Sequence, residues 1–223
     1  MTQGPAGWLY RGWKPAAVVL AGGPLPAPEW LRSEMRMEDA FVACADGGVR
    51  HLRPLGLTAH LWMGDGDSSV GAGGEAAESR LYPVDKDETD LELVLGEVAR
   101  RGFTPVALLG AIGARWDHTL ANFHLAAAFR MQGGPIALYG EGCRARILWR
   151  DEEVLVADAA FDTVSLVPLA GDARGVTSRG LRWELDGSTL AWNRARGVSN
   201  RLEGERATVR AGEGLAVLLE QRT

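Results

Sequence analysis

The sequence predicts two domains, an N-terminal α/β domain and a C-terminal all-β domain. Before about residue 145, continuous apolar runs alternate with helical segments, as expected for a mostly parallel sheet with helices on both faces. After that point the apolar runs are short, partly alternating and separated by turns that contain Gly, Asp or Asn, which is typical of an antiparallel β-sandwich or barrel. Hydrophobic residues make up 46% of the 223 residues, enough for a well-buried core.

The expected strands of the first domain are apolar runs that end in polar or glycine-rich turns. They cover residues 18–20, 40–45, 61–63, 106–109 and 136–139. In an open parallel sheet the carboxyl ends of such strands lie at one edge, and ligands bind outside that edge at a switch point of the strand order. We therefore expect the turns after these strands to form one site.

Two helices are expected between these strands. Thr89 and Glu92 have the spacing of a capping box, and helical periodicity then continues to a terminating Gly102. A second helix is expected from about His118 to the Gly133–Pro135 turn, with a packed face made of four apolar residues. These are Leu120, Phe123, Ala127 and Ala128.

The second half contains short expected strands. They cover residues 146–149, 154–156, 163–169, 181–185, 189–192, 207–209 and 215–219. The change in pattern places the domain boundary near residues 145–152, and we take the domains as 1–147 and 148–223.

Composition excludes several classes of protein. The net charge is −5 and no basic stripe is present, which disfavours a nucleic-acid partner. No segment approaches the ~20 apolar residues of a membrane span, and the N-terminus does not have the pattern of a signal peptide. With only Cys44 and Cys143, a disulfide framework is not expected. We expect a cytoplasmic protein without a membrane partner.

Carboxylates recur just after the apolar runs or at the start of a helix. They are Asp46, Asp65, Asp67, Asp85, Asp87 and Asp90. Clustered carboxylates are costly unless they share a cation, and hard oxygen ligands favour Mg²⁺ or Mn²⁺ with a phosphorylated ligand. Asp65 and Asp67 point the same way in extended backbone, and Asp90 at a helix N-terminus supplies a third metal ligand.

Each of these acidic positions also has a structural explanation. The segment Asp65-Gly66-Asp67-Ser68 is good turn chemistry and could be a solvated turn. Asp90 could simply complement the helix dipole. Residues 46–48, Asp-Gly-Gly, could be an ordinary strand-to-helix turn. The metal interpretation depends on all of them meeting at one edge.

Arg115 and Asp117 flank Trp116 near the expected start of the second helix. One interpretation is an exposed ion pair. In the other, Arg115 holds phosphate oxygens and Asp117 orients or deprotonates a hydroxyl group.

Taken in order, these segments resemble the thiamine pyrophosphokinase family over roughly residues 16–220. In the first half the resemblance is carried by residues 45–48 (Ala-Asp-Gly-Gly), 64–68 (Gly-Asp-Gly-Asp-Ser), 85–90 (Asp-Lys-Asp-Glu-Thr-Asp) and 110–118 (Gly-Ala-Ile-Gly-Ala-Arg-Trp-Asp-His). In the second half it is carried by residues 165–169, 175–183 and 197–200. The chain departs from the family pattern at Gly66 and Ala114.

The resemblance implies a homodimeric, Mg²⁺-dependent enzyme that transfers a diphosphoryl group from ATP to the hydroxyl of thiamine, giving thiamine diphosphate and AMP. It implies that Asp65, Asp67 and Asp90 bind the metal and that Arg115 and Asp117 act in catalysis. The implied nucleotide-binding residues are Asp46, Gly47, Gly48, Ser68, Lys86, Thr89 and Arg115.

The resemblance also implies that the β domain binds thiamine and forms the dimer. Trp183 would stack on a ring of thiamine, and Thr177, Ser178, Ser199 or Asn200 would supply hydrogen bonds.

Other functions use similar acidic residues. Residues 65–69 also resemble the segment around an aspartyl nucleophile of a phosphatase. A metal-dependent glycosyltransferase, a pterin diphosphokinase and a non-catalytic nucleotide- or thiamine-binding protein are further alternatives. Release of AMP from ATP and thiamine separates the first interpretation from all of these.

Overall fold

The computed structural model describes residues 12–66, 76–113, 115–132, 134–156 and 161–222. Their contacts divide them into two compact units, residues 12–141 and residues 142–222. Each unit is described by itself. The domain limits expected from the sequence, 1–147 and 148–223, stay a prediction.

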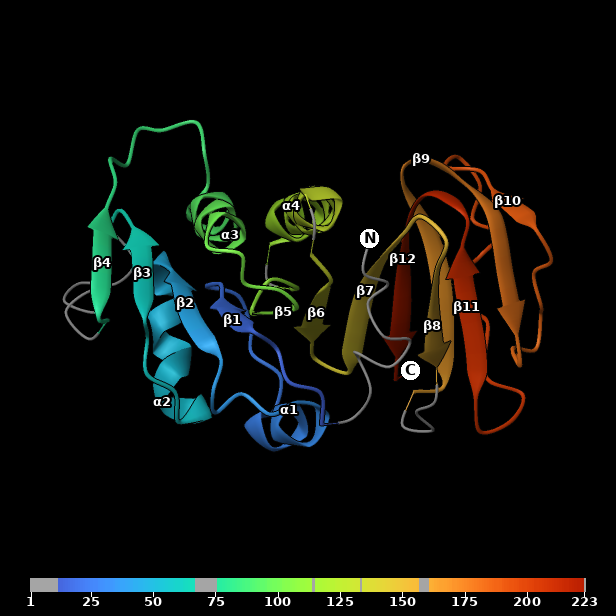
Figure 1. Ribbon diagram of the computed structural model, residues 1–223, viewed down its shortest axis with the longest axis horizontal. Helices are drawn as coiled ribbons and strands as arrows, with labels where there is room; N and C mark the ends of the chain where they lie inside the picture. The colour runs from blue at the N-terminus through green and yellow to red at the C-terminus, as the bar shows by residue number, and fades with distance from the viewer. Residues whose placement is uncertain (1–11, 67–75, 114, 133, 157–160, 223) are drawn as a thin grey trace. The chain divides into compact units, whose positions relative to one another are not determined.

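The first unit contains a parallel sheet in the order β4-β3-β2-β1-β5-β6 (Figure 1). Every neighbouring pair in this order runs parallel. The strands are β1 (Ala17–Leu20), β2 (Phe41–Ala45), β3 (Leu61–Gly64), β4 (Glu78–Leu81), β5 (Val106–Leu109) and β6 (Ile136–Gly140).

Burial of these strands shows that both faces of the sheet are covered. Every residue of β1, β3, β5 and β6 is buried, although successive side chains point to opposite faces. The predicted α/β architecture is therefore confirmed. The sequence did not predict β4, which lies at the edge of the sheet and in which half-buried and exposed residues alternate.

The helices of this unit are α1 (Pro28–Glu34), the 3₁₀ helix η1 (Asp46–His51), α2 (Leu52–Leu55), α3 (Asp90–Arg100) and α4 (Trp116–Gln132). The predicted cap of α3 is present, because the Thr89 hydroxyl accepts a hydrogen bond from the Glu92 amide at 3.2 Å. At the other end of α3, the buried Glu97 carboxylate accepts hydrogen bonds from Arg80 on β4 and from Arg101. These contacts fix the direction in which α3 presents its N-terminus.

The packed face predicted for α4 is partly wrong. Leu120 is 63% exposed and Ala128 is also exposed, whereas Thr119 and Asn122 are buried. Thr119 and Asn122 are buried because they make hydrogen bonds to the preceding loop. The Asn122 amide donates to the Ala111 carbonyl at 2.8 Å, and the Thr119 hydroxyl accepts from the Gly113 amide at 3.0 Å. The helix is oriented to hold the loop that precedes it.

The second unit is antiparallel, as predicted. Its strands pair in the order β7-β12-β9-β11-β8, and β10 pairs with β9. They are β7 (Cys143–Trp149), β8 (Glu152–Val156), β9 (Thr163–Arg179), β10 (Ser188–Leu190), β11 (Ala207–Ala211) and β12 (Glu213–Gln221). Aliphatic side chains from all six of these strands form one core. In the part of the chain that the structure describes, no helix has the length and apolar character needed to cross a bilayer.

Two of the strand predictions for this unit differ from the structure. Strand β9 continues past residue 169, because Ala170 (φ +61°) and Gly171 (φ +114°) bend it without ending it. The strand expected at residues 181–185 is absent from this described segment, where Leu181 makes a single bridge to Leu202 and bends follow.

A buried ion-pair cluster lies within the second unit. The Glu220 carboxylate is 2.7 Å from Nη2 of Arg144 and 2.9 Å from Nη2 of Arg146, and all three residues are buried. Burial raises the pKa of Glu220, but the two guanidinium groups outweigh it and lower the pKa overall.

Candidate active site

A cavity of about 500 Å³ lies at the carboxyl ends of the parallel strands. Its lining comes from the turns after β1, β2, β3 and β5 and from the first residues of α3 and α4. After β1 the chain forms β2, β3 and β4 on one side and then returns to form β5 and β6 on the other, so β1 and β5 flank the switch point. The cavity is therefore where open α/β sheets place their ligands.

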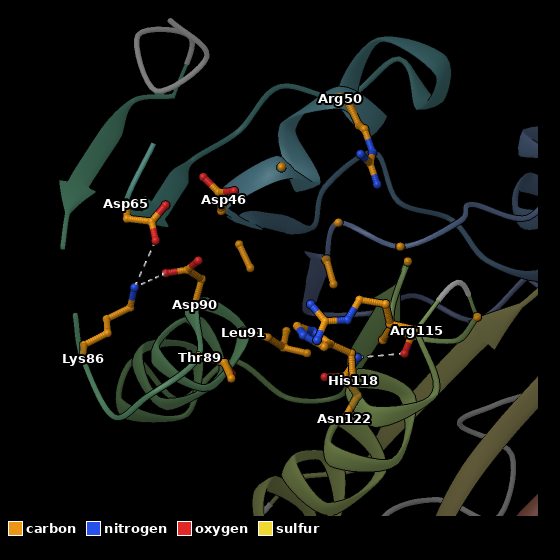
Figure 2. Close-up of a pocket in the computed structure, with 18 residues that line it drawn as sticks. Asp46, Arg50, Asp65, Lys86, Thr89, Asp90, Leu91, Arg115, His118 and Asn122 are labelled. Atoms are coloured by element: carbon orange, nitrogen blue, oxygen red, sulfur yellow. Dashed lines mark hydrogen bonds and ion pairs between the residues drawn. The ribbon is translucent and has the colours of Figure 1, made fainter. Parts of the chain in front are cut away.

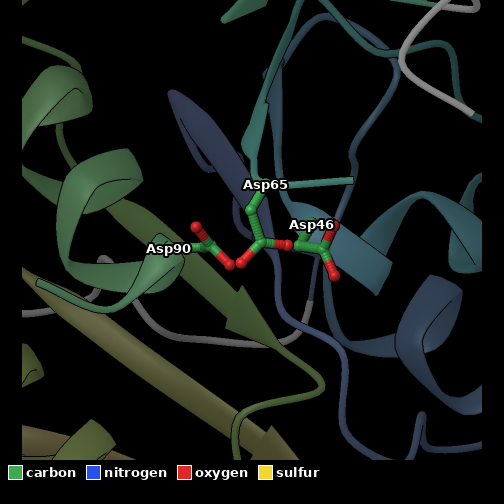
Figure 3. Close-up of side chains that lie close together, drawn as sticks. All are labelled: Asp46, Asp65 and Asp90. Atoms are coloured by element: carbon green, nitrogen blue, oxygen red, sulfur yellow. The ribbon is translucent and has the colours of Figure 1, made fainter. Parts of the chain in front are cut away.

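Three carboxylates meet at one end of this cavity. One oxygen each from Asp46, Asp65 and Asp90 lies within 4.8 Å of the others (Figure 3). The three residues follow β2, follow β3 and begin α3. Three hard oxygen donors so close together suit a divalent cation such as Mg²⁺ or Mn²⁺.

Local backbone geometry brings Asp46 into this group. Asp46 has φ +36°, which is uncommon for a residue with a side chain, and its carbonyl accepts a hydrogen bond from the Trp62 indole at 3.1 Å. A Cβ at Gly64 would lie 2.8 Å from the Asp46 Cβ, so only glycine allows this approach. A Cβ at Gly48 would lie 2.0 Å from the Leu20 carbonyl oxygen, so glycine is required there too.

Lys86 places a positive charge beside the carboxylates. Its ammonium lies 3.1 Å from Asp90 and 3.6 Å from Asp65, and its side chain is only 12% exposed (Figure 2). Burial lowers the pKa of Lys86, but the pairs with Asp90 and Asp65 outweigh it and raise the pKa overall. Burial raises the pKa of Asp90, and Asp65 and Asp46 add to that effect.

Arginine lines the opposite side of the cavity (Figure 2). Arg115 makes two hydrogen bonds to the Asp117 carboxylate, at 3.2 and 2.5 Å, and both side chains are about two-thirds exposed (67% and 64%). Asp117 also accepts from the His118 amide at 2.9 Å. The bonds from Arg115 lower the pKa of Asp117 to about 2. Arg115 lines the cavity but Asp117 does not.

The structure brings together most of the site residues predicted for the first half. Asp46, Gly47, Asp65, Lys86, Thr89, Asp90 and Arg115 all line the cavity. Gly48 packs behind it against β1. Asp85 and Asp87 are exposed and do not belong to the carboxylate group. Asp67 and Ser68 lie outside the described residues.

Sequence reasoning missed several lining residues. They include Gly22, Gly23, Arg50, His118 and Asn122. Arg50 could have been found from the sequence, because it lies only four residues after Asp46, in the turn that follows the apolar run 40–45. His118, from which the second helix was expected to begin, is exposed and lines the cavity.

The second unit has its own cavity, of about 560 Å³. Trp183, 53% exposed, and Asn200 line it, together with Glu184, Arg196 and several aliphatic side chains. The Asn200 side chain accepts from the Trp183 amide at 3.1 Å and donates to the Trp183 carbonyl at 2.7 Å. The guanidinium groups of Arg182 and Arg201 lie 5.2 and 5.8 Å from the centre of the Trp183 ring, so this indole already attracts cations. Its position beside the Glu184 carboxylate makes it a suitable site for an aromatic cation.

The other three β-domain residues predicted to bind substrate do not line this cavity. The buried Ser178 hydroxyl accepts from the Leu185 amide at 2.9 Å, and the Thr177 hydroxyl accepts from the Gly187 amide at 3.3 Å. Both hydrogen bonds hold the loop that carries Trp183. The Ser199 amide donates to the Ser165 hydroxyl at 3.0 Å.

Two family profiles match this chain in succession. Residues 33–138 match "Thiamin pyrophosphokinase, catalytic domain", and residues 152–216 match "Thiamin pyrophosphokinase, vitamin B1 binding domain". "Thiamine pyrophosphokinase" of Bacillus subtilis is 23% identical over 206 residues, which cover 90% of this chain and 96% of that protein. "Thiamine pyrophosphokinase 1" of rice is 24% identical over 140 residues, and the match spans about half (52%) of its length.

Solved structures share the fold. The crystal structure of thiamine pyrophosphokinase from Bacillus subtilis has a TM-score of 0.81 at 21% identity and covers 93% of this chain and 99% of that one. Thiamin pyrophosphokinase from Candida albicans has a TM-score of 0.72 at 13% identity and covers 100% and 95% of the two chains.

Proposed function

Since the chain belongs to the thiamine pyrophosphokinase family of enzymes, we propose that it transfers the terminal diphosphoryl group of ATP to the hydroxyl group of thiamine. The products are thiamine diphosphate and AMP. The observation that carries the proposal is a single cavity with three convergent carboxylates at one end and arginine at the other. This arrangement suits a metal-bound polyphosphate.

Asp46, Asp65 and Asp90 fit a divalent metal ion, and we propose that they hold Mg²⁺. Their oxygens are hard donors within 4.8 Å of one another, and the Lys86 ammonium beside them is an observed cation at the same place. When bound, Mg²⁺ would neutralise charge on the phosphoryl oxygens of ATP. Asp67, which was expected to bind the metal together with Asp65 and Asp90, is replaced in this proposal by Asp46.

The residues of the cavity act on the polyphosphate while the thiamine hydroxyl attacks it. The thiamine hydroxyl oxygen bonds to the β-phosphorus, the bond from that phosphorus to the bridging oxygen breaks, and the electron pair stays on AMP. The hydroxyl proton leaves to solvent. Lys86 and Arg115 hold phosphoryl oxygens in position, and Thr89 and Gly47 border the same space.

The proposed role of Asp117 is to orient Arg115. Its carboxylate makes two hydrogen bonds to that guanidinium, and its pKa of about 2 makes it a weak base. This favours orientation over the alternative of removing the hydroxyl proton.

We propose that thiamine binds in the cavity of the second unit. Trp183 would stack on a ring, and Glu184 would attract the thiazolium charge. Asn200 acts by holding the Trp183 backbone. Thr177, Ser178 and Ser199 support the loops of the cavity in this proposal and do not contact the substrate.

Incubation with thiamine, ATP and Mg²⁺ tests the proposal. We expect stoichiometric thiamine diphosphate and AMP. Free phosphate in the absence of thiamine would indicate a phosphatase, transfer to a pterin alcohol but not to thiamine would indicate the related diphosphokinase, and binding without turnover would indicate a non-catalytic protein. A homodimer and a cytoplasmic location remain predictions, and sedimentation equilibrium tests the dimer.

A further inference from the structure

Arg50 lines the cavity of the first unit. Within the described part of the chain, its guanidinium makes no hydrogen bond or ion pair, whereas Arg115 is bound by Asp117. Arg50 belongs to η1, and its side chain is drawn in Figure 2 on the other side of the cavity from Lys86. A guanidinium facing a cavity with no carboxylate bound to it is available for an anionic ligand.

The guanidinium of Arg50 reaches over the turn after β1. A Cβ built on Gly22 would lie 3.9 Å from its Nη2 atom. The neighbouring His51 ring nitrogen Nε2 is 2.9 Å from the Gly23 carbonyl oxygen, which ties η1 to the same turn. Arg50 is therefore held above the switch point, between the carboxylates that follow β2 and β3 and the Arg115 that follows β5.

The part of the cavity beside Arg50 is lined mainly by glycine backbone. Gly22, Gly23, Gly47 and Gly110 line it, and the Gly23 amide donates to the Gly110 carbonyl at 2.7 Å. Without side chains in this stretch, a phosphate chain can pass close to the backbone from the acidic end to the arginine end. In such an arrangement, the phosphate that follows the diphosphoryl group held by the carboxylates and their metal would lie beside Arg50.

We propose that Arg50 binds the phosphate that remains with the nucleotide, the α-phosphate of ATP and the phosphate of AMP. The inference depends on the proposed function, in which the carboxylates and their metal hold the diphosphoryl group that is transferred. When the bridging bond to the β-phosphorus breaks, its electron pair adds charge to the α-phosphate. A cation at that position stabilises the transition state more than the bound substrate, so Arg50 contributes to catalysis as well as binding.

Equilibrium binding of AMP, adenosine and inorganic pyrophosphate to the whole chain, measured by calorimetry, tests this assignment. We expect the Kd for AMP to rise at least ~10-fold in Arg50→Gln, because a hydrogen-bonded charge pair is lost. The Kd values for adenosine and for pyrophosphate should stay within about 2-fold of the unaltered protein. Arg50→Lys should recover part of the AMP affinity, since it keeps the charge but loses the planar fork.

Arg53→Gln is the matched control, because Arg53 is exposed on the adjoining α2 and does not line the cavity. It should bind all three ligands normally. The assignment is wrong if Arg50→Gln leaves the Kd for AMP unchanged, weakens adenosine as much as AMP, or weakens pyrophosphate alone. Failure of the unaltered protein to bind AMP also overturns it. Failure to produce AMP from ATP and thiamine, with AMP binding intact, overturns the proposed function instead.

Discussion

Asp65→Asn removes one of the three convergent carboxylates while keeping the shape of the side chain. The ligand oxygens lie within 4.8 Å of one another, so two of these unit charges repel each other by roughly 3.5 kcal/mol at an effective dielectric constant of about 20 unless a cation lies between them. Asp65→Asn removes one charged ligand of that cation, and after lost hydration is allowed for we expect a net loss of about 3 kcal/mol in binding free energy. We expect Mg²⁺ affinity, and AMP formation at limiting Mg²⁺, to fall at least ~10²-fold.

Two measurements separate a metal role from damage to the fold. Mn²⁺ binding followed by electron paramagnetic resonance should weaken in Asp65→Asn, whereas the free energy of unfolding without metal should change by less than about 1 kcal/mol, because the lost pair with Lys86 is offset by relief of repulsion from Asp90. The control is Asp85→Asn, an exposed carboxylate outside the group. Near-normal AMP formation and Mn²⁺ binding by Asp65→Asn would refute the metal assignment.

Three further changes test other parts of the structure. Trp183→Ala should raise the KM for thiamine at least ~10-fold with little change in thermal stability, and a fall in stability with unchanged KM would make Trp183 a structural residue. Glu220→Gln should lower the free energy of unfolding in urea by about 3–5 kcal/mol, because it leaves buried Arg144 uncompensated. Because the folded pKa of Glu220 is lowered, its stabilising contribution is present above the unfolded pKa of about 4.3 and is lost as pH falls below it, so the variant should show a weaker acid dependence than the unaltered protein. Gly48→Ala should cost at least ~1–3 kcal/mol of unfolding free energy, since its Cβ would lie 2.0 Å from the Leu20 carbonyl oxygen, and an unchanged urea midpoint would show that the turn adjusts freely.

Local patterns in the sequence predicted those parts of the fold that depend on neighbouring residues. Continuous apolar runs identified β1 and β5, and the Thr89 cap identified the start of α3. The edge strand β4 was missed because its residues are mostly polar and partly exposed, so they carry no apolar run. The bend at Ala170 and Gly171 reads as a turn in the sequence, although pairing with β12 and β11 continues on either side of it.

The family and the general position of the site could also be predicted, and the comparisons confirm the family. The composition of the acidic group could not, because it depends on strand order. Asp46 lies beside Asp65 because β2 and β3 are adjacent. Arg50, which follows β2, reaches the turn after β1 because β1 and β2 are adjacent. The role of Ser178 in substrate binding was implied by the family resemblance and stays a prediction. Its hydrogen bond with the Leu185 amide could not be predicted, because it depends on how residues 180–187 fold back.

The ammonium group of Lys86 affects the affinity of the carboxylate group for a divalent ion. It already neutralises part of the charge on Asp65 and Asp90, so the carboxylates can stay together when no divalent ion is bound. Loading the site is then an exchange of one cation for another. A dissociation constant measured for this protein reports the difference between the two states, and it understates the attraction of the carboxylates themselves.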